Sequence, residues 1–192
     1  MTEKEDLRVT KTRMNIEKTF VRMLESMPFD KITVRGIVAA ALVNKDTFYR
    51  HYQDKYDLAE KAFARVQDQA RSGIRARVEG IASRVPLATL LESFQSELSQ
   101  LMPEVVAFRS VPLRNGSVEL QMERLFAEEF SRATVRWGAS PIGRDAPDWV
   151  VSNLAMGYLR HCWETGEASD PVAYLREVHE VSGLYLSQVR RD

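Results

Sequence analysis

Two consecutive short helices, each with its own start signal, constrain the fold of this 192-residue chain more than any other feature. The first helix has Thr33 at its cap position, because a threonine hydroxyl can accept a hydrogen bond from a free amide of the first turn. Ile32 lies just before this cap and Ile37 lies four residues after it, which is the arrangement of a hydrophobic staple. The sequence therefore predicts a helix that begins after Thr33 and enters at a fixed angle.

The second helix repeats this pattern eleven residues later. Asn44 is suited to cap it, with Val43 outside the helix and Phe48 inside. Phe48 and Tyr52 lie four residues apart and should face inward, which leaves the polar residues of the helix outside. A helix of about seven residues is only marginally stable alone, so the preceding apolar helix, which ends before Pro28, must hold it. The segment predicts a helix-turn-helix.

The distribution of charge supports a polyanionic partner for this segment. Over the whole chain, 27 Lys and Arg residues balance 27 Asp and Glu residues. Between Arg8 and Lys55, by contrast, basic residues outnumber acidic ones, and most of the lysines lie in this part of the sequence. Because phosphate contacts dominate affinity for duplex DNA, this local excess favours a DNA-binding site.

The same segment resembles the DNA-binding region of the TetR family of bacterial transcriptional repressors. The resemblance rests on Thr47-Phe48-Tyr49-Arg50-His51-Tyr52, followed by Asp54-Lys55 and Leu58, and preceded by Phe29-Asp30-Lys31-Ile32-Thr33-Val34 and Ile37. It covers about the first sixty residues. The remaining two thirds resemble the family only in length and helical character.

The resemblance implies a set of DNA-contacting residues. Thr33 and Arg35 correspond to contacts at the start of the supporting helix, and Lys55, with the free amides of the next helix, to a phosphate site. An N-terminal arm with Arg8, Lys11 and Arg13 is a further candidate for contacts to the backbone or the minor groove. The complete predicted set is Thr33, Arg35, Asn44, Lys45, Asp46, Thr47, Tyr49, Arg50, His51 and Lys55.

Two residues depart from the family pattern. Leu42 stands at the turn position that glycine usually fills, and a positive φ there would cost on the order of 1 kcal/mol. We therefore expect a slightly rebuilt turn. Asp46 places a carboxylate on the face that meets DNA. It either accepts a hydrogen bond from the amino group of cytosine, or its negative charge stabilises the N-terminus of the helix by interacting with the helix dipole. We prefer the second interpretation.

The rest of the chain predicts an all-α fold of about nine helices in two domains, a helix-turn-helix domain over residues 1–55 and a helical ligand-binding and dimerisation domain over residues 56–192. Apolar periodicity predicts helices over 58–81 and 87–101, the second ended by Pro103 and followed by a short segment with Val105 and Phe108. Ser117 is expected to start another helix, and a loop spans 138–147. The last two helices are expected over 149–163 and 171–189, the latter with Asp170 as cap and Pro171 at its first position.

The resemblance also implies a homodimer and an effector pocket in the second domain. Core packing is the alternative for every residue assigned to either. The expected dimer interface comprises Tyr158, Cys162, Val178, Val181, Tyr185 and Val189. The expected pocket comprises Phe94, Met102, Phe108, Met122, Phe126, Phe130, Trp137, Trp149 and Met156.

These observations favour a DNA-binding transcriptional regulator. The resemblance implies that it is a repressor, that it binds a pseudo-palindromic duplex operator as a homodimer, and that an unidentified small molecule releases it from the operator. The alternative is an interaction module that keeps the helix-turn-helix for protein contacts without binding DNA. An enzyme is disfavoured, because the sequence holds no phosphate loop, metal-ligand cluster or nucleophile with a base, and we expect neither metal nor cofactor. The absence of a long apolar run or signal peptide predicts a cytoplasmic protein that does not enter the membrane.

Overall fold

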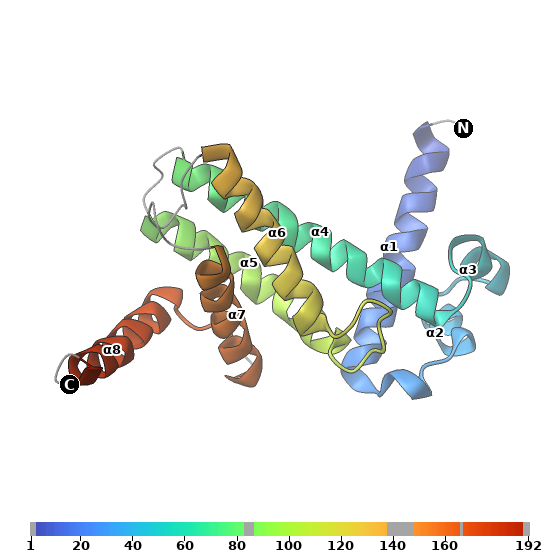
Figure 1. Cartoon of the computed structure of the whole chain (residues 1–192). Coiled ribbons are helices and arrows are strands. Elements are labelled where there is room, and N and C mark those ends of the chain that lie inside the picture. Colours follow the sequence, from blue (N-terminus) through green and yellow to red (C-terminus); the bar gives the residue numbers. More distant parts are fainter. Residues whose placement is uncertain (1–2, 83–86, 138–147, 166, 190–192) are drawn as a thin grey trace. The chain divides into compact units, whose positions relative to one another are not determined.

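The computed structural model describes residues 3–82, 87–137, 148–165 and 167–189, and all regular secondary structure in this part of the chain is helical (Figure 1). The all-α prediction is thus confirmed, with eight α-helices and one 3-10 helix in the described residues. The N-terminal elements are α1 (Glu3–Ser26), the 3-10 helix η1 (Phe29–Lys31), α2 (Val34–Ala40) and α3 (Lys45–His51). The remaining helices are α4 (Lys55–Ala82), α5 (Leu87–Phe108), α6 (Val118–Trp137), α7 (Asp148–Thr165) and α8 (Pro171–Val189).

The chain divides into two compact units, which do not follow the order of the sequence. The first unit comprises residues 1–69 and 103–121, and the second comprises residues 70–102 and 122–192. The helix-turn-helix therefore shares its unit with the start of α4 and the end of α5, beyond the predicted boundary at residue 55. The assignment of DNA binding and ligand binding to residues 1–55 and 56–192 stays a prediction.

The core of the first unit is built around aromatic side chains from α1, α4 and α5. Phe20 is fully buried, and its ring contacts those of Phe29 and Phe108 at centroid distances of 6.2 and 6.1 Å. Phe63 meets Phe108 from α4 at 5.3 Å. Phe108 had been assigned by resemblance to an effector pocket, but its side chain fills the core of the unit that holds the helix-turn-helix. This burial favours the core-packing alternative for Phe108, and its assignment to an effector pocket stays a prediction.

Pro103 does not end α5, which corrects the sequence-based boundary. The helix continues through it to Phe108, although proline has no amide to donate to the helical ladder. Val105 and Phe108, which follow the proline, are 2% and 0% exposed. Burial of these side chains in the first unit stabilises the last turn of α5 against the lost hydrogen bond, because each buried large apolar side chain contributes about 2 kcal/mol.

Two predicted helix starts in the later part of the chain are confirmed. The Ser117 hydroxyl accepts a hydrogen bond from the Leu120 amide at the start of α6. Asp170 Oδ1 accepts one from the Val172 amide, and α8 begins at Pro171. Proline suits this first position because the amide that it lacks would have no partner inside the helix. The described helices contain none that is long and apolar enough to cross a membrane.

The predicted dimer residues on α7 are already covered within the second unit. Tyr158 is 4% exposed, and its hydroxyl donates a hydrogen bond to the Ser169 carbonyl. Cys162 is fully buried, with its sulfur 3.6 Å from the Ser169 hydroxyl. Both side chains thus serve packing inside one chain. On α8, Val181 is 52% exposed and Val178 is half-buried, whereas the side chains of Tyr185 and Val189 lie outside the described residues.

Candidate nucleic-acid interface

The two short helices begin where their caps predicted. Thr33 Oγ1 accepts a hydrogen bond from the Gly36 amide at 3.1 Å, and Asn44 Oδ1 accepts one from the Thr47 amide at 2.7 Å. Both caps have extended backbone angles, as a residue just outside a helix requires. Each cap satisfies one of the amides that have no partner inside the helix. Local chemistry therefore fixes the first residues of α2 and α3.

The turn between α2 and α3 keeps the conformation that glycine would favour. Leu42 has a φ of 54°, and it is the only residue other than glycine with a positive φ in the described part of the chain. The surrounding backbone is held by the Val43 amide, which donates to the Val38 carbonyl, and by the Asn15 side chain, which donates to the Ala41 carbonyl at 2.8 Å. The expectation of a rebuilt turn is wrong: this frame holds a leucine in the left-handed region.

Burial of the Leu42 side chain does not compensate the strain energy of its backbone conformation. Its side chain is 92% exposed, so it contributes almost no hydrophobic stabilisation to the folded chain. The left-handed conformation of a residue with a Cβ atom costs roughly 1–2 kcal/mol. The turn is therefore a point where this chain departs from the pattern at a measurable energetic cost.

The inward and outward faces of α3 are those that the sequence predicted. Phe48 and Tyr52 are 0% and 1% exposed, and their ring centroids lie 5.5 Å apart. The Tyr49 ring stands edge-on to Phe48 at 5.4 Å while remaining 55% exposed. Packing thus holds α3 from behind and leaves its polar face open. Of the predicted contact residues here, Asn44, Lys45, Asp46, Tyr49 and Arg50 are exposed and Thr47 and His51 are half-buried.

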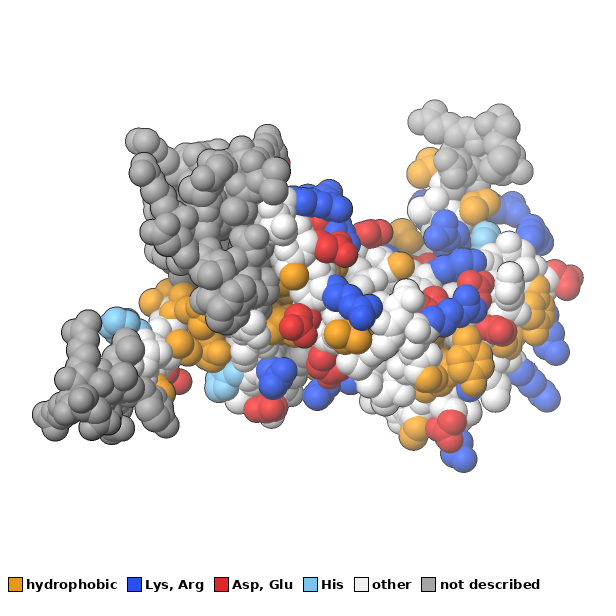
Figure 2. All heavy atoms as spheres, in the orientation of Figure 1, with side chains coloured by type: hydrophobic (Ala, Val, Ile, Leu, Met, Phe, Trp, Pro, Cys, Tyr) orange, Lys and Arg blue, Asp and Glu red, His pale blue; other side chains and the backbone are white. Residues whose placement is uncertain are grey.

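The supporting helix presents its predicted residues at its start. Thr33 and Arg35 are both exposed, although the Thr33 hydroxyl is used in the cap. Figure 2 shows Lys and Arg side chains distributed over the part of the surface formed by α1–α4, with acidic side chains among them. The structure therefore brings the predicted set into one unit, on α2, α3 and the start of α4.

Lys55 has a different environment from the one predicted. Its ammonium donates to the carbonyls of Phe29, Asp30 and Ile32 at 2.8, 3.3 and 2.9 Å, and it lies 4.5 Å from the centroid of the Phe29 ring. A lysine ammonium has three donors, and here all three are directed to backbone oxygens. The predicted phosphate contact stays a prediction, but in this structure the side chain fastens η1 to α4.

The amides at the start of α4 are also partly occupied. Asp54 Oδ1 accepts hydrogen bonds from the amides of Tyr56 and Asp57, both at 2.8 Å. Asp57 Oδ2 in turn accepts from the Gln53 amide at 2.9 Å. The Asp54 carboxylate therefore binds two of the amides that were expected to be free to bind a phosphate.

His51 lies at the end of α3 among basic side chains. Partial burial lowers the pKa of its imidazole, and the positive charges of Arg13, Arg50 and Lys61 lower it further. Both effects favour the neutral form of the ring over the charged form. His51 can act there as a hydrogen-bond donor without a formal charge.

The polar residues that join α3 to the rest of its unit were not predicted from the sequence. Glu17 on α1 is 4% exposed, and its carboxylate accepts hydrogen bonds from the Tyr52 hydroxyl and from Arg65 Nε at 2.9 and 3.2 Å. A glutamate next to Ile16, inside the apolar stripe of α1, was the available signal. Its partners lie 35 and 48 residues away, so spacing did not reveal them.

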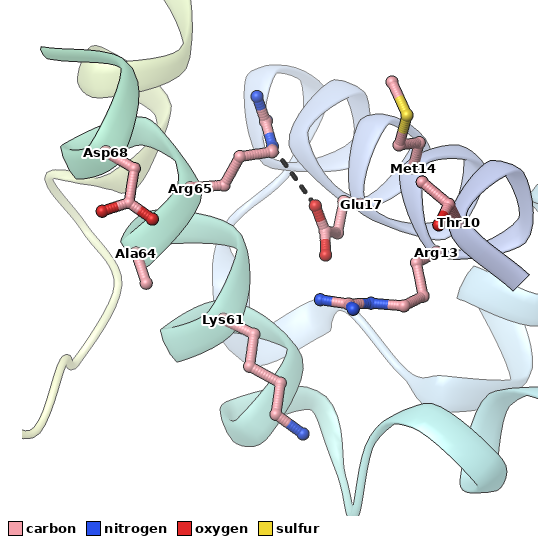
Figure 3. A pocket seen from close by; sticks show the side chains of 8 residues that line it. All are labelled: Thr10, Arg13, Met14, Glu17, Lys61, Ala64, Arg65 and Asp68. Atoms are coloured by element: carbon pink, nitrogen blue, oxygen red, sulfur yellow. Dashed lines mark hydrogen bonds and ion pairs between the residues drawn. The ribbon is translucent and has the colours of Figure 1, made fainter. Parts of the chain in front are cut away.

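A cavity of about 390 Å³ lies between α1 and α4 beside this glutamate (Figure 3). The wall combines basic, acidic and apolar side chains of the first unit. The residues are Thr10, Arg13, Met14, Glu17, Lys61, Ala64, Arg65 and Asp68. It holds none of the aromatic residues that were predicted to line an effector pocket. Met102, Met122, Phe126 and Met156 are buried in the second unit, and the side chains of Phe94, Phe130, Trp137 and Trp149 lie outside the described residues.

Two capped helices joined by a tight turn, with an exposed polar face on the second, define a helix-turn-helix domain. Residues 21–62 match the family model described as bacterial regulatory proteins, tetR family. The helix-turn-helix is thus that of the TetR family, as the sequence resemblance predicted. No curated protein is significantly similar to the sequence.

Solved structures of TetR-family regulators share the fold over most of the chain. A TetR-family transcriptional regulator from Syntrophomonas wolfei superposes with a TM-score of 0.61 at 16% identity, covering 88% of this chain and 91% of its own. A transcriptional regulator from Pseudomonas aeruginosa PAO1 gives 0.61 at 19% identity, covering 93% and 92%. NalD, described as the secondary repressor of the MexAB-OprM multidrug efflux pump in Pseudomonas aeruginosa, gives 0.55 at 19% identity, covering 90% and 94%. At these identities the similarity establishes the fold of the second unit and nothing finer.

Proposed function

We propose that this protein is a DNA-binding transcriptional regulator whose α3 enters the major groove of a duplex operator. The single observation that carries the proposal is the two-sided character of α3, buried through Phe48 and Tyr52 and exposed through its polar residues. An exposed row of side chains on a rigidly held helix is what reading base edges requires, because a mobile helix would lose affinity to ordering entropy. Tyr49, Arg50 and Lys45 are the proposed principal contacts.

We assign different roles to the other members of the predicted set. Thr33 and Arg35 at the start of α2, with Thr47 and His51, are proposed to contact the phosphate backbone. Asn44 acts chiefly through its cap to the Thr47 amide. Asp46 in the first turn of α3 favours the helix through the dipole. Lys55 acts by positioning α4, through its three carbonyl partners.

The regulator is proposed to act as a homodimer and as a repressor in the cytoplasm. A dimer places two recognition helices about 34 Å apart, which matches successive major grooves of a pseudo-palindromic site. On α8, Val172, Leu175 and Val181 are 39%, 40% and 52% exposed, which supplies apolar surface for a second copy. Repression is supported by the likeness to NalD, whose description names a repressor. A small-molecule effector that releases the dimer from DNA completes the proposal, and no catalytic activity is part of it.

The test is selection of bound sequences from a random duplex pool by the purified protein at two salt concentrations. A recovered pseudo-palindrome, bound more weakly at higher salt, supports the proposal, because phosphate contacts release counterions on binding. Tyr49→Ala should then weaken binding about tenfold or more without lowering the unfolding temperature, since the ring is mostly exposed. Unchanged affinity in this variant would contradict the docking of α3.

A protein-interaction module without DNA binding is the second candidate, and the exposed Leu42 favours it. An apolar side chain that is 92% exposed in a strained turn suits a contact with protein more than one with a polyanion. Recovery of no sequence motif at either salt concentration, together with a partner whose binding has no steep salt dependence, would establish this candidate over the first.

A further inference from the structure

A continuous series of hydrogen bonds leads from the end of α3 to α5 within the first unit. The Tyr52 hydroxyl donates to Glu17 Oε1, and Glu17 Oε2 accepts from Arg65 Nε. Nη2 of the same guanidinium donates to Glu104 Oε2 on α5. Four helices, α3, α1, α4 and α5, therefore share one polar path through Tyr52, Glu17, Arg65 and Glu104, which we call the relay.

The central carboxylate of the relay depends on its partners. Glu17 is 4% exposed, and a buried carboxylate is stable only when hydrogen bonds and an opposite charge compensate its lost hydration. One of its oxygens accepts a hydrogen bond from Tyr52 and the other accepts one from Arg65 on α4. Burial and the Glu17 carboxylate raise the pKa of Tyr52, so its hydroxyl keeps its proton and remains a donor. A shift of either partner therefore changes the environment of the other.

The relay reaches α5 at Glu104, next to a proline inside the helix. Glu104 directly follows Pro103, where the chain of α5 passes from the second unit into the first. The helical ladder is interrupted here, since Pro103 has no amide to donate. The last turn of α5 is thus less firmly tied to the preceding turns than in a continuous helix. Its side-chain contact to Arg65 is half-exposed, unlike the buried contact at Glu17.

We propose that Glu17 and Arg65 are positioning residues that couple the end of α5 at Glu104 to the orientation of the recognition helix through Tyr52. The proposal rests on the proposed DNA binding for its consequence, since the end of α3 is fixed by the relay while its exposed residues contact DNA. Figure 3 shows Arg13 and Arg65 on different sides of Glu17, with the cavity beside them. This cavity leaves room for the guanidinium of Arg65 to change position when Glu104 no longer holds it.

Amide hydrogen exchange of the full chain tests the coupling without DNA. In Glu104→Ala, the amides at the end of α3 should exchange about two- to tenfold faster, the range that loss of one ordinary hydrogen bond gives. The matched control is Glu119→Ala, which breaks the ion pair to Arg109 in the same unit, 30% exposed on the glutamate where Glu104 is 26% exposed. The control should leave α3 exchange unchanged.

Tyr52→Phe separates coupling from general loss of stability. This variant removes only the hydroxyl at the α3 end of the relay and keeps the buried ring, so the chain is expected to fold. Once that contact is lost, adding Glu104→Ala should accelerate α3 exchange no further, because the path is already broken. Unchanged or slower α3 exchange in Glu104→Ala, or an equal acceleration with and without the Tyr52 hydroxyl, would overturn the proposal.

The same variants are then measured on the selected duplex. Tyr52→Phe and Glu104→Ala should each weaken binding about two- to tenfold, with the double variant no weaker than Tyr52→Phe alone. The salt dependence should stay that of the wild type, since no phosphate contact is removed. If the wild-type protein binds no duplex, the proposed function fails while the exchange pattern still decides the relay. Additive losses of affinity would count against the relay even where DNA binding is present.

Discussion

Among the described residues, each unit of this protein buries one glutamate, and the two glutamates differ in the groups that donate hydrogen bonds to them. In the first unit, Glu17 accepts hydrogen bonds from Arg65 and from the neutral hydroxyl of Tyr52, and Arg13 lies beside it in the wall of the same cavity. In the second unit, Glu129 is 3% exposed and accepts hydrogen bonds from three arginines, Arg71, Arg75 and Arg132. Three guanidinium groups thus donate to Glu129, so the contacts in this arginine cluster are redundant. In the described contacts of Glu17, one guanidinium donates to the carboxylate.

This difference matters for what each carboxylate can do. The Glu129 cluster joins only α4 and α6, and the side chains of Arg75 and Arg132 are 52% and 61% exposed, so water can replace either contact. Glu17 joins α1 to α3 and α4, with little water to take over a lost partner. A redundant cluster keeps two helices together under many conditions, and a singular path changes when any member changes. The first arrangement suits a fixed connection and the second suits a coupled one.

Loss of Arg65 should have the largest effect on stability. Arg65→Ala removes the ion pair of Glu17, and breaking the ion pair of a buried carboxylate should cost about 3 kcal/mol of unfolding free energy. Urea unfolding followed by circular dichroism measures this change. A cost below that of the matched change in the second unit would contradict the contrast between the two sites.

That matched change is Arg71→Ala at Glu129. Arg71 is 26% exposed, as Arg65 is, but two arginines remain on the carboxylate after its removal. The expected cost is about 1 kcal/mol, that of one hydrogen bond to a charged group with compensation left in place. The same urea titration measures it, and the pair of variants tests redundancy directly.

Acid should weaken the second unit through Glu129. Hydrogen bonding to Arg75, the largest cause, and to Arg71 lowers the pKa of this carboxyl below its ordinary value of 4.5. A lowered folded-state pKa contributes stability above the ordinary value, and this contribution is lost as the pH falls from about 4.5 through the lowered pKa. The unfolding temperature of the wild type should therefore fall more steeply below this pH than the unfolding temperature of Glu129→Gln. Parallel pH profiles would show that the arginines do not act through the charge of Glu129.

The smallest predicted effect concerns the turn of the first unit and has the opposite sign. Leu42→Gly should raise the unfolding free energy by about 0.5 kcal/mol, because relief of the strained φ exceeds the added backbone entropy of the unfolded chain. Leu42→Ala keeps the Cβ atom and therefore should not stabilise, which makes it the control. A stabilised Leu42→Ala would trace the effect to the exposed side chain and not to the backbone.

Local signals in the sequence were sufficient for the elements that begin with a cap. Thr33, Asn44 and Asp170 each bond an amide two or three residues ahead, so nearby residues alone set these helix starts. The inward position of Phe48 likewise follows from helical periodicity. Pro103 was misjudged because burial of Val105 and Phe108, a tertiary effect, outweighs its missing amide. The ring contacts of Phe108 could not be predicted for the same reason, since its partners Phe20 and Phe63 come from other helices.

The sequence by itself determined the family of the helix-turn-helix, its capped helix starts and the exposed face of α3, because these depend on residues within one or two turns of each other. Tertiary structure alone decided the partners of those charged side chains that pair with distant parts of the chain. Lys55 fastens to carbonyls more than twenty residues back, and Glu17 meets Tyr52 and Arg65 across the fold. Charge carries no periodicity that indicates its partner, so an ion pair between distant helices becomes visible only when the chain has folded.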